Sequence, residues 1–220
     1  MAGSPGVSVI RAPRPQVGAR DAAVVLALGA LRGWELGRSR RNLARSAAGA
    51  APPAAPRSYP LMVTVHLALF TVPLVRRWHR PSPPVPLRLG SLAVLGAATA
   101  LRAWSIASLG SAWNVEARVP PALVPVQRGP YRFCRHPNYL AVTAEFLALP
   151  AFLGAAREAA WLSAGNLLVL WPRVRGEERR LLMIPAYRTA FATTPRFIPR
   201  LRRPGRGRSP TPRGGPPAPG

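Results

Sequence analysis

The chain has 220 residues, which is the size of one ordinary domain. Its 31 basic residues are all arginines, against seven acidic residues, but they flank apolar runs instead of forming one basic face; this pattern is typical of membrane boundaries and argues against a nucleic-acid-binding protein. The single cysteine, Cys134, excludes an internal disulfide and a multi-cysteine metal site.

The apolar runs predict an all-α, multi-pass integral membrane protein with about five transmembrane helices and no cleavable signal peptide. The first run is short for a membrane span. It carries Arg32 and Glu35, which lie three residues apart and are therefore expected to pair. The third run is the clearest span. The expected helices cover residues 21–36, 59–75, 87–109, 139–153 and 159–171.

Polar and proline-rich segments separate these helices. A tight helix–helix turn is expected at residues 154–158, and an amphipathic stretch at 177–197. The two ends of the chain are rich in Arg, Pro and Gly, so residues 1–20 and 200–220 are expected to be disordered. The predicted membrane domain covers residues 21–199 between them. The remaining connections are expected at 37–58, 76–86 and 111–127.

The most informative stretch is Arg128–Tyr139, which concentrates Arg, Tyr, His and Asn side chains directly before an apolar run. Gly129-Pro130 indicates a turn. Pro137 disfavours a helical conformation at His136 and suits the first turn of a helix that starts near Asn138. A polar cluster is therefore expected at the mouth of a membrane helix.

A second polar cluster, Arg173-Val-Arg-Gly-Glu177-Glu178, follows the next helical hairpin. Because two spans lie between the clusters, both are expected on the same side of the bilayer, and the distribution of arginines favours the cytoplasmic side, in a bacterial cytoplasmic membrane. The sequence thus predicts that His136 and the carboxylates of Glu177 and Glu178 meet in one cavity that binds a polar, partly cationic ligand.

The paired motifs resemble the isoprenylcysteine carboxyl methyltransferase family of integral membrane methyltransferases. The resemblance covers about residues 20–200 and rests on Gly-Pro-Tyr-Arg-x-x-Arg-His-Pro-Asn-Tyr from Gly129 and on Arg-Val-x-x-Glu-Glu-x-x-Leu from Arg173. More narrowly, Trp104-Ser-Ile-Ala-Ser-Leu-Gly-Ser-Ala-Trp113-Asn114 and Glu145-Phe-Leu-Ala-Leu-Pro150 resemble the bacterial branch that O-methylates alkylpyrones and alkylresorcinols made by type III polyketide synthases.

The resemblance implies S-adenosylmethionine as the cofactor and a lipophilic acceptor, with a functional link to a type III polyketide synthase. It places Arg173 on the acceptor side, as the catalytic residue that holds the acceptor oxyanion. The family has Gln at the position of Glu116. The residues that it implies for cofactor binding are Tyr131, His136, Pro137, Asn138, Tyr139, Glu177 and Glu178, with Leu123, Val124, Pro125 and Val126 as a less specific match.

Other polar residues in the spans have structural interpretations. His66 and Asn166 are expected to form hydrogen bonds between helices, with a role as catalytic base as the alternative for His66. Glu145 is expected to pair with an arginine or to line the pocket, and Cys134 to be inert. Three other functions stay open: prenylcysteine carboxyl methylation, a sterol-reductase-like membrane enzyme, and a non-enzymatic basic membrane scaffold.

Overall fold

The computed structural model describes residues 17–45, 51–53, 58–78, 80–120 and 123–198. The predicted disordered tail and most of the predicted disordered N-terminal segment lie outside these residues. The described part is all-helical and contains no strand. Its helices are α1 (Ala19–Arg45), α2 (Ser58–Trp78), α3 (Val85–Leu109), α4 (Pro137–Phe152), α5 (Ala156–Met183) and α6 (Pro185–Ala190).

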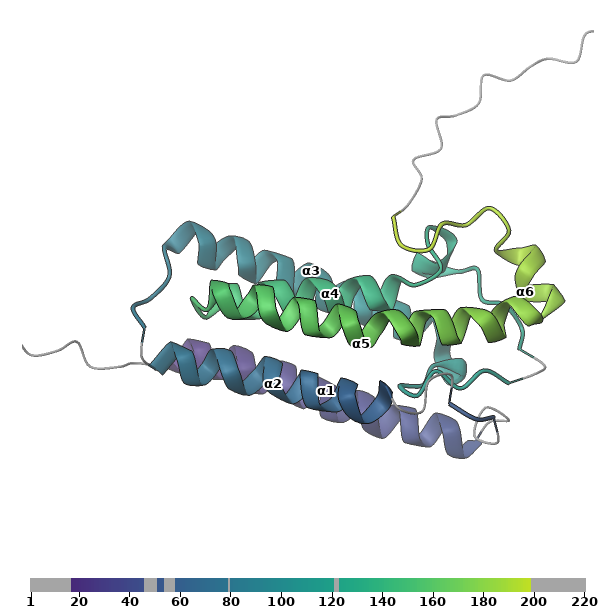
Figure 1. Ribbon diagram of the computed structural model, residues 1–220, viewed down its shortest axis with the longest axis horizontal. Helices are drawn as coiled ribbons and strands as arrows, with labels where there is room; N and C mark the ends of the chain where they lie inside the picture. Colours follow the sequence, from purple (N-terminus) through teal and green to yellow (C-terminus); the bar gives the residue numbers. More distant parts are fainter. Residues whose placement is uncertain (1–16, 46–50, 54–57, 79, 121–122, 199–220) are drawn as a thin grey trace, which may run out of the picture.

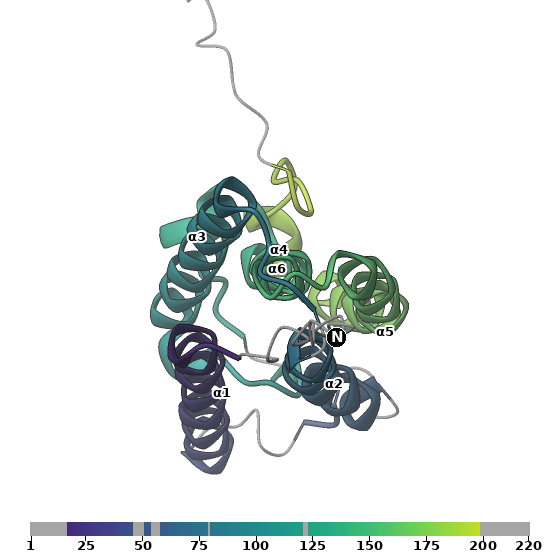
Figure 2. The same ribbon diagram turned by 90° about the vertical axis from the view of Figure 1, so that its left-hand side faces the viewer.

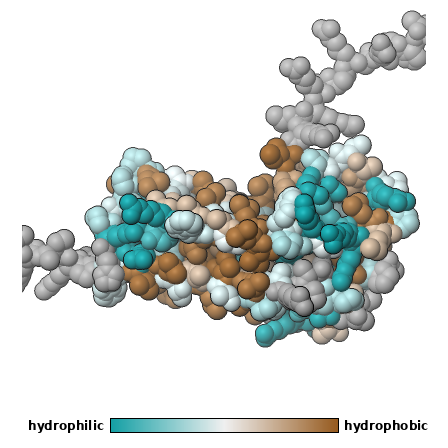
Figure 3. Space-filling model, viewed as in Figure 1, coloured by the Kyte–Doolittle hydropathy of each residue, from teal (hydrophilic) through white to brown (hydrophobic). Residues whose placement is uncertain are grey.

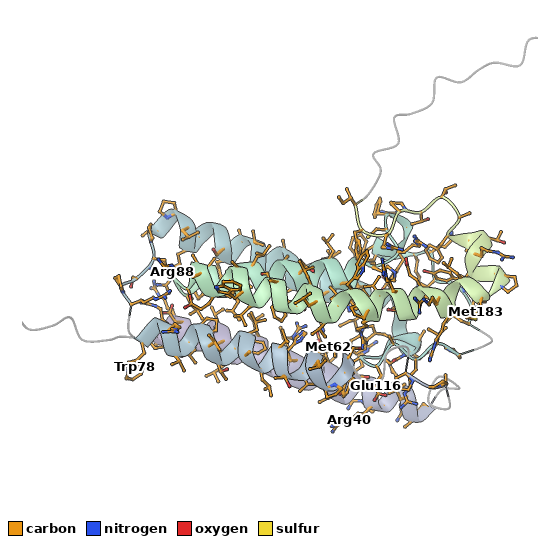
Figure 4. The ribbon with its side chains drawn as sticks, in the orientation of Figure 1. Arg40, Met62, Trp78, Arg88, Glu116 and Met183 are labelled. Atoms are coloured by element: carbon orange, nitrogen blue, oxygen red, sulfur yellow. The ribbon has the colours of Figure 1, made fainter. Side chains whose placement is uncertain are left out.

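The five long helices run beside one another along the long axis of the molecule, and the short α6 lies at one end (Figure 1). Figure 2 looks along the bundle and shows α4 between α3 and α5, with α2 next to α5 and α1 on the side of α3. Glu116 and Met183 mark one end of the bundle, here called the site end, while Trp78 and Arg88 mark the distal end (Figure 4).

Two helical segments are long and apolar enough to cross a membrane, namely α2 and the segment Val85–Ala112 formed by α3 and the 3₁₀ turn that follows it. They match the second and third predicted spans, whereas the prediction of five spans is not confirmed. With 16 residues, α4 is shorter than the ~20 that normally cross a bilayer. Both α1 and α5 continue into arginine-rich turns.

Two helices extend further than the sequence predicts. Helix α1 continues to Arg45 instead of ending at Leu36. Its added turns are fixed by Asn42, whose side-chain nitrogen donates to the carbonyls of Gly110 and Trp113 at 3.1 and 2.6 Å. Helix α5 passes through Pro172 and ends at Met183, so the second polar cluster lies inside this helix instead of after it.

The apolar core lies between α2, α3 and α4, where Leu69, Phe146, Leu149 and Leu153 are fully buried. Many other large apolar side chains face outwards, including Leu26, Trp161 and Leu168. On the face shown in Figure 3, hydrophobic surface crosses the middle of the molecule, here called the hydrophobic belt, and hydrophilic surface gathers towards both ends. An exposed apolar surface of this extent marks an interaction site, and its belt shape suits a lipid bilayer.

Ion pairs join the helices at the distal end. Asp21 of α1 is buried and accepts hydrogen bonds from Arg77, at 3.1 Å, and from Arg88. The guanidinium of Arg80 contacts both carboxylate oxygens of Glu158, at 3.0 and 3.1 Å. These contacts hold the α1 start, the α2–α3 connection and the α5 start together.

A second buried ion-pair cluster lies in the interior, between α1, α3 and α4. The guanidinium of Arg102 donates to both carboxylate oxygens of Glu35 at 2.8–3.0 Å. The predicted pair of Arg32 and Glu35 is confirmed at 2.9 Å, and Arg32 also reaches Glu145 at 3.5 Å, as expected for a carboxylate in this helix.

Candidate functional site

The stretch Arg128–Tyr139, from here on called the central motif, forms the predicted turn and helix start. Gly129 opens a 3₁₀ turn with φ of +61°, a conformation that residues with a side chain rarely adopt. A Cβ atom there would lie 2.0 Å from Ser108 Oγ, so the position also requires the absence of a side chain. Helix α4 then begins at Pro137, with His136 before it in a non-helical conformation at φ −129° and ψ 55°. Glycine and proline thereby aim the polar side chains of this stretch at α5.

His136 meets Glu178 of α5, as the sequence predicts. The two side chains are buried, and His136 Nε2 donates to Glu178 Oε1 at 3.2 Å. Glu178 also accepts a hydrogen bond from Arg196 and lies 3.4 Å from the Arg135 guanidinium. Burial alone would raise the pKa of the Glu178 carboxyl, but the hydrogen bonds from His136 and Arg196 outweigh it and lower the pKa to about 2. Glu178 is therefore an anion that holds His136 and two arginines in place.

Glu177 makes a different set of contacts one residue earlier. Its carboxylate accepts a hydrogen bond from the hydroxyl of Tyr139 at 2.5 Å. The same hydroxyl accepts from Nε of Arg173 at 3.1 Å, and Arg173 also donates to the Val115 carbonyl. The side chains of Tyr139 and Arg173 are therefore oriented from several directions, which is what a preorganised binding site requires.

A cavity of about 800 Å³ opens from these groups into the interior of the bundle. Its wall is mainly apolar and comes mostly from α1, α2, α4, α5 and the connection before α4, with smaller contributions from α3 and α6. Pro137, Glu178 and Glu116 do not line it, and Glu116 instead pairs with Arg118 at 2.7 Å. The sequence-predicted residues that do line it are Leu123, Val124, Pro125, Val126, Tyr131, His136, Asn138, Tyr139, Arg173 and Glu177.

The cavity contains polar atoms that no described residue satisfies. Asn138 Oδ1 and Arg173 Nη1 are buried without a hydrogen-bond partner in the described part of the chain. Six of the seven acidic residues form ion pairs with arginines, but Glu177 forms none with a described residue. Buried polar atoms are normally paired, so Asn138 Oδ1 and Arg173 Nη1 are available to bind a polar ligand.

The chain segment after α6 adds site residues that the sequence analysis missed. The backbone N–H groups of Arg135 and His136 donate to the carbonyls of Pro195 and Arg196, at 2.9 and 3.1 Å. Phe197 packs against the His136 ring with a centroid distance of 5.9 Å. No motif in this segment signals the contact, because it depends on how the chain turns back after α6.

Two expectations for polar residues in the spans are wrong. His66 Nδ1 bonds to the Met62 carbonyl of its own helix at 2.8 Å instead of reaching another helix. The amide nitrogen of Asn166 has no hydrogen-bond partner among the described residues. Both side chains instead line the cavity. Cys134 is a buried free thiol, and burial raises its pKa.

Comparison with known proteins shows the family of the chain. The family model described as "Isoprenylcysteine carboxyl methyltransferase (ICMT) family" matches residues 91–183, which include both polar clusters. The "Uncharacterized protein YpbQ" of Bacillus subtilis (strain 168) is 32% identical over 123 residues, which cover 56% of this chain and 73% of that protein. No solved structure matches. The chain therefore belongs to the isoprenylcysteine carboxyl methyltransferase family, whose members are membrane methyltransferases that use S-adenosylmethionine.

Proposed function

We propose that the protein is an O-methyltransferase that transfers the methyl group of S-adenosylmethionine to a hydroxyl of a lipophilic ring acceptor, an alkylpyrone or an alkylresorcinol. One observation carries the proposal: a single cavity joins the carboxylate of Glu177, which has no arginine partner among the described residues, to the apolar faces of four helices. A cationic cofactor fits the first part of this cavity and a hydrocarbon tail fits the second.

The residues at the site end of the cavity fit the cofactor. Glu177 is placed to bind the ammonium group or the ribose hydroxyls, both of which donate hydrogen bonds to a carboxylate. The unpartnered Asn138 Oδ1 offers a further acceptor for such groups. Tyr131, His136 and Tyr139 line the same region and provide flat surfaces for the adenine. We further propose that residues 123–126 form the opposite wall, as the family resemblance implies.

Arg173 is the proposed acceptor-side residue. S-adenosylmethionine supplies an activated methyl group, so that positioning of the acceptor accounts for much of the catalysis. The free Nη1 of Arg173 lies buried in the cavity, and a charge-assisted hydrogen bond from it to an acceptor oxyanion contributes about 1.5–3 kcal/mol. A hydroxypyrone is acidic enough to ionise without a strong base, and for a less acidic resorcinol the Arg173 guanidinium would stabilise the phenolate as its proton leaves to water, so Tyr139, whose hydroxyl already bonds to Glu177 and Arg173, is not needed as a base.

We propose that the acceptor reaches the cavity from the bilayer, in a multi-pass protein of the cytoplasmic membrane whose site end faces the cytoplasm. The hydrophobic belt supports the membrane position (Figure 3), and the arginine-rich segments near the site end support the orientation. An acceptor of this kind would be the product of a type III polyketide synthase. Residues 21–199 are the proposed catalytic domain.

The test is binding and methyl transfer by the purified protein in detergent. The wild type is expected to bind S-adenosylmethionine and to methylate a 5-alkylresorcinol or a 6-alkyl-4-hydroxypyrone. Glu177→Ala and His136→Ala should abolish cofactor binding, whereas Arg173→Ala should reduce turnover more than cofactor affinity. Ser163→Ala is a matched control, because Ser163 is buried in α5 with an unpartnered hydroxyl but does not line the cavity. Unchanged binding in both cofactor-site variants would reject the site.

A second acceptor class is favoured by the same free guanidinium nitrogen. Arg173 Nη1 can bind a carboxylate as well as a phenolate, and a carboxylate is the acceptor in prenylcysteine methylation. Assaying an S-prenyl cysteine beside the ring acceptors separates the two: methyl transfer to the prenyl cysteine alone would replace the proposed acceptor while keeping the methyltransferase. Binding of a nicotinamide cofactor without binding of S-adenosylmethionine would instead indicate a reductase. If the protein binds neither cofactor and the variants behave like the wild type, the result would indicate a scaffold.

A further inference from the structure

The deeper part of the cavity contains two polar side chains that the proposed transfer does not use, His66 of α2 and Asn166 of α5. The two helices run antiparallel, because Arg76 near the end of α2 lies 3.4 Å from Glu158 near the start of α5. At the site end, Tyr59 of α2 and Arg173 of α5 line the same cavity.

This register places His66 and Asn166 at one level of the bundle. His66 follows Tyr59 by seven residues and Asn166 precedes Arg173 by seven, so both lie about 10 Å further from the site end along their helices. The side chain of a helical arginine extends towards the helix N-terminus, which is the direction of Asn166, and the gap between the Arg173 guanidinium and this level is correspondingly shorter. A ring with two oxygen atoms can therefore direct one oxygen at Arg173 and the other at this level.

Asn166 has an unused hydrogen-bond donor at this level. Its side chain is 3% exposed, it lines the cavity, and its Nδ2 atom has no partner among the described residues. A buried amide donor without a partner is unfavourable and needs an explanation. Water or a ligand oxygen in the cavity is the available partner.

His66 offers the complementary group. Its Nδ1 atom lies 2.8 Å from the Met62 carbonyl, which can only accept, so Nδ1 carries the proton and the neutral ring has its lone pair on Nε2. The ring is held edge-on against Phe146 at a centroid distance of 5.1 Å. The pair therefore presents one donor and one acceptor to the cavity.

We infer that His66 and Asn166 form a second polar subsite, which binds a non-reacting hydroxyl of the acceptor ring by donation from Asn166 Nδ2 and acceptance at His66 Nε2. Among the oxygen groups of such a ring, only a hydroxyl can satisfy both, because a carbonyl or ether oxygen has no proton to donate. The inference rests on the proposed function and narrows it: within the ring acceptors, dihydroxy rings of the alkylresorcinol class fit better than alkylpyrones, whose other oxygens are acceptors only.

The test compares three acceptors with the same alkyl tail: a 5-alkylresorcinol, a 3-alkylphenol without the second oxygen, and a 3-methoxy-5-alkylphenol whose second oxygen cannot donate. For the wild type, kcat/KM for the resorcinol, corrected for its two equivalent hydroxyls, should exceed that of either analogue at least about tenfold. Asn166→Leu should lower kcat/KM for the resorcinol about tenfold and leave the alkylphenol unchanged. Ser163→Ala should change neither.

His66→Phe is the second variant, because it keeps an aromatic ring against Phe146 and is expected to lose the preference for the resorcinol over its methoxy analogue. S-adenosylmethionine affinity, measured for each variant, reports correct folding. An equal effect of both variants on all three acceptors, or a wild type without the preference, would overturn the subsite while leaving the proposed function intact. Intact cofactor binding with no transfer to any ring acceptor would instead refute the proposed acceptor class, and the subsite with it.

Discussion

The buried ion pair of Arg102 and Glu35 yields a sharp prediction about stability. Arg102 is 6% exposed and Glu35 is 5% exposed, and three N–O contacts of 2.8–3.0 Å join them between α3 and α1. Replacing Arg102 by Met leaves the Glu35 carboxylate buried with only Arg32 as its partner, at 2.9 Å. Leaving a charge of this kind incompletely compensated costs about 3–5 kcal/mol of unfolding free energy.

The double variant Arg102→Met/Glu35→Met separates pairing from packing. Because it removes both charges and leaves apolar side chains of similar length, it should recover most of the loss seen in either single variant. Arg32 then keeps Glu145, at 3.5 Å, as its counter-charge. Unfolding free energies would be measured by SDS titration in mixed micelles, followed by circular dichroism.

Arg76→Met is the control for an exposed ion pair, since its guanidinium lies 3.4 Å from Glu158 but the Arg76 side chain is 60% exposed. It should cost no more than about 1 kcal/mol. A double variant as unstable as the sum of its two single variants would show that the buried pair is not coupled, and would refute the reasoning.

Three further predictions concern the site. Glu177→Gln removes the charge that faces the cavity but keeps an acceptor for the Tyr139 hydroxyl, so calorimetry should show weaker S-adenosylmethionine binding without a loss of thermal stability. Glu178 has a pKa of about 2 in place of 4.5, so its contribution to stability is complete above pH 4.5 and disappears as the pH falls towards 2. Denaturation at several pH values should show this loss, and Glu178→Gln should make the unfolding free energy less dependent on pH over this range. Gly129→Ala meets the Ser108 hydroxyl and an unfavourable φ, so its melting temperature should fall, and Gly129→Ala/Ser108→Gly should recover only part of the fall. Equal melting temperatures for the wild type and Gly129→Ala would contradict the geometry.

The sequence was sufficient to predict the meeting of the two polar clusters. A turn at Gly129-Pro130, a helix start at Pro137 and a hairpin between the clusters together bring His136 to Glu178. These features depend on local backbone preferences and on the even number of helices between the two clusters, both of which can be read from a sequence.

Other features depend on the final packing and could not be predicted in the same way. Pro172 favours a break in α5, because a proline removes a backbone hydrogen bond and its ring crowds the preceding turn, yet the helix continues to Met183. Asn166 and His66 look like residues that join helices, but they line a cavity that forms only when several helices pack around it. The different roles of Glu177 and Glu178 follow from side-chain direction and not from residue type.

The return of residues 195–197 over the central motif has a practical consequence for handling the protein. The segment accepts two hydrogen bonds from Arg135 and His136 through its main-chain carbonyls, so most substitutions within it preserve them. A truncation that deletes residues 195–197 removes both hydrogen bonds. Affinity tags should consequently be fused after Phe197, and truncated variants should retain the chain up to this residue. A version cut before Pro195 would expose the His136 ring and weaken ligand capture even though every residue of both family motifs is present.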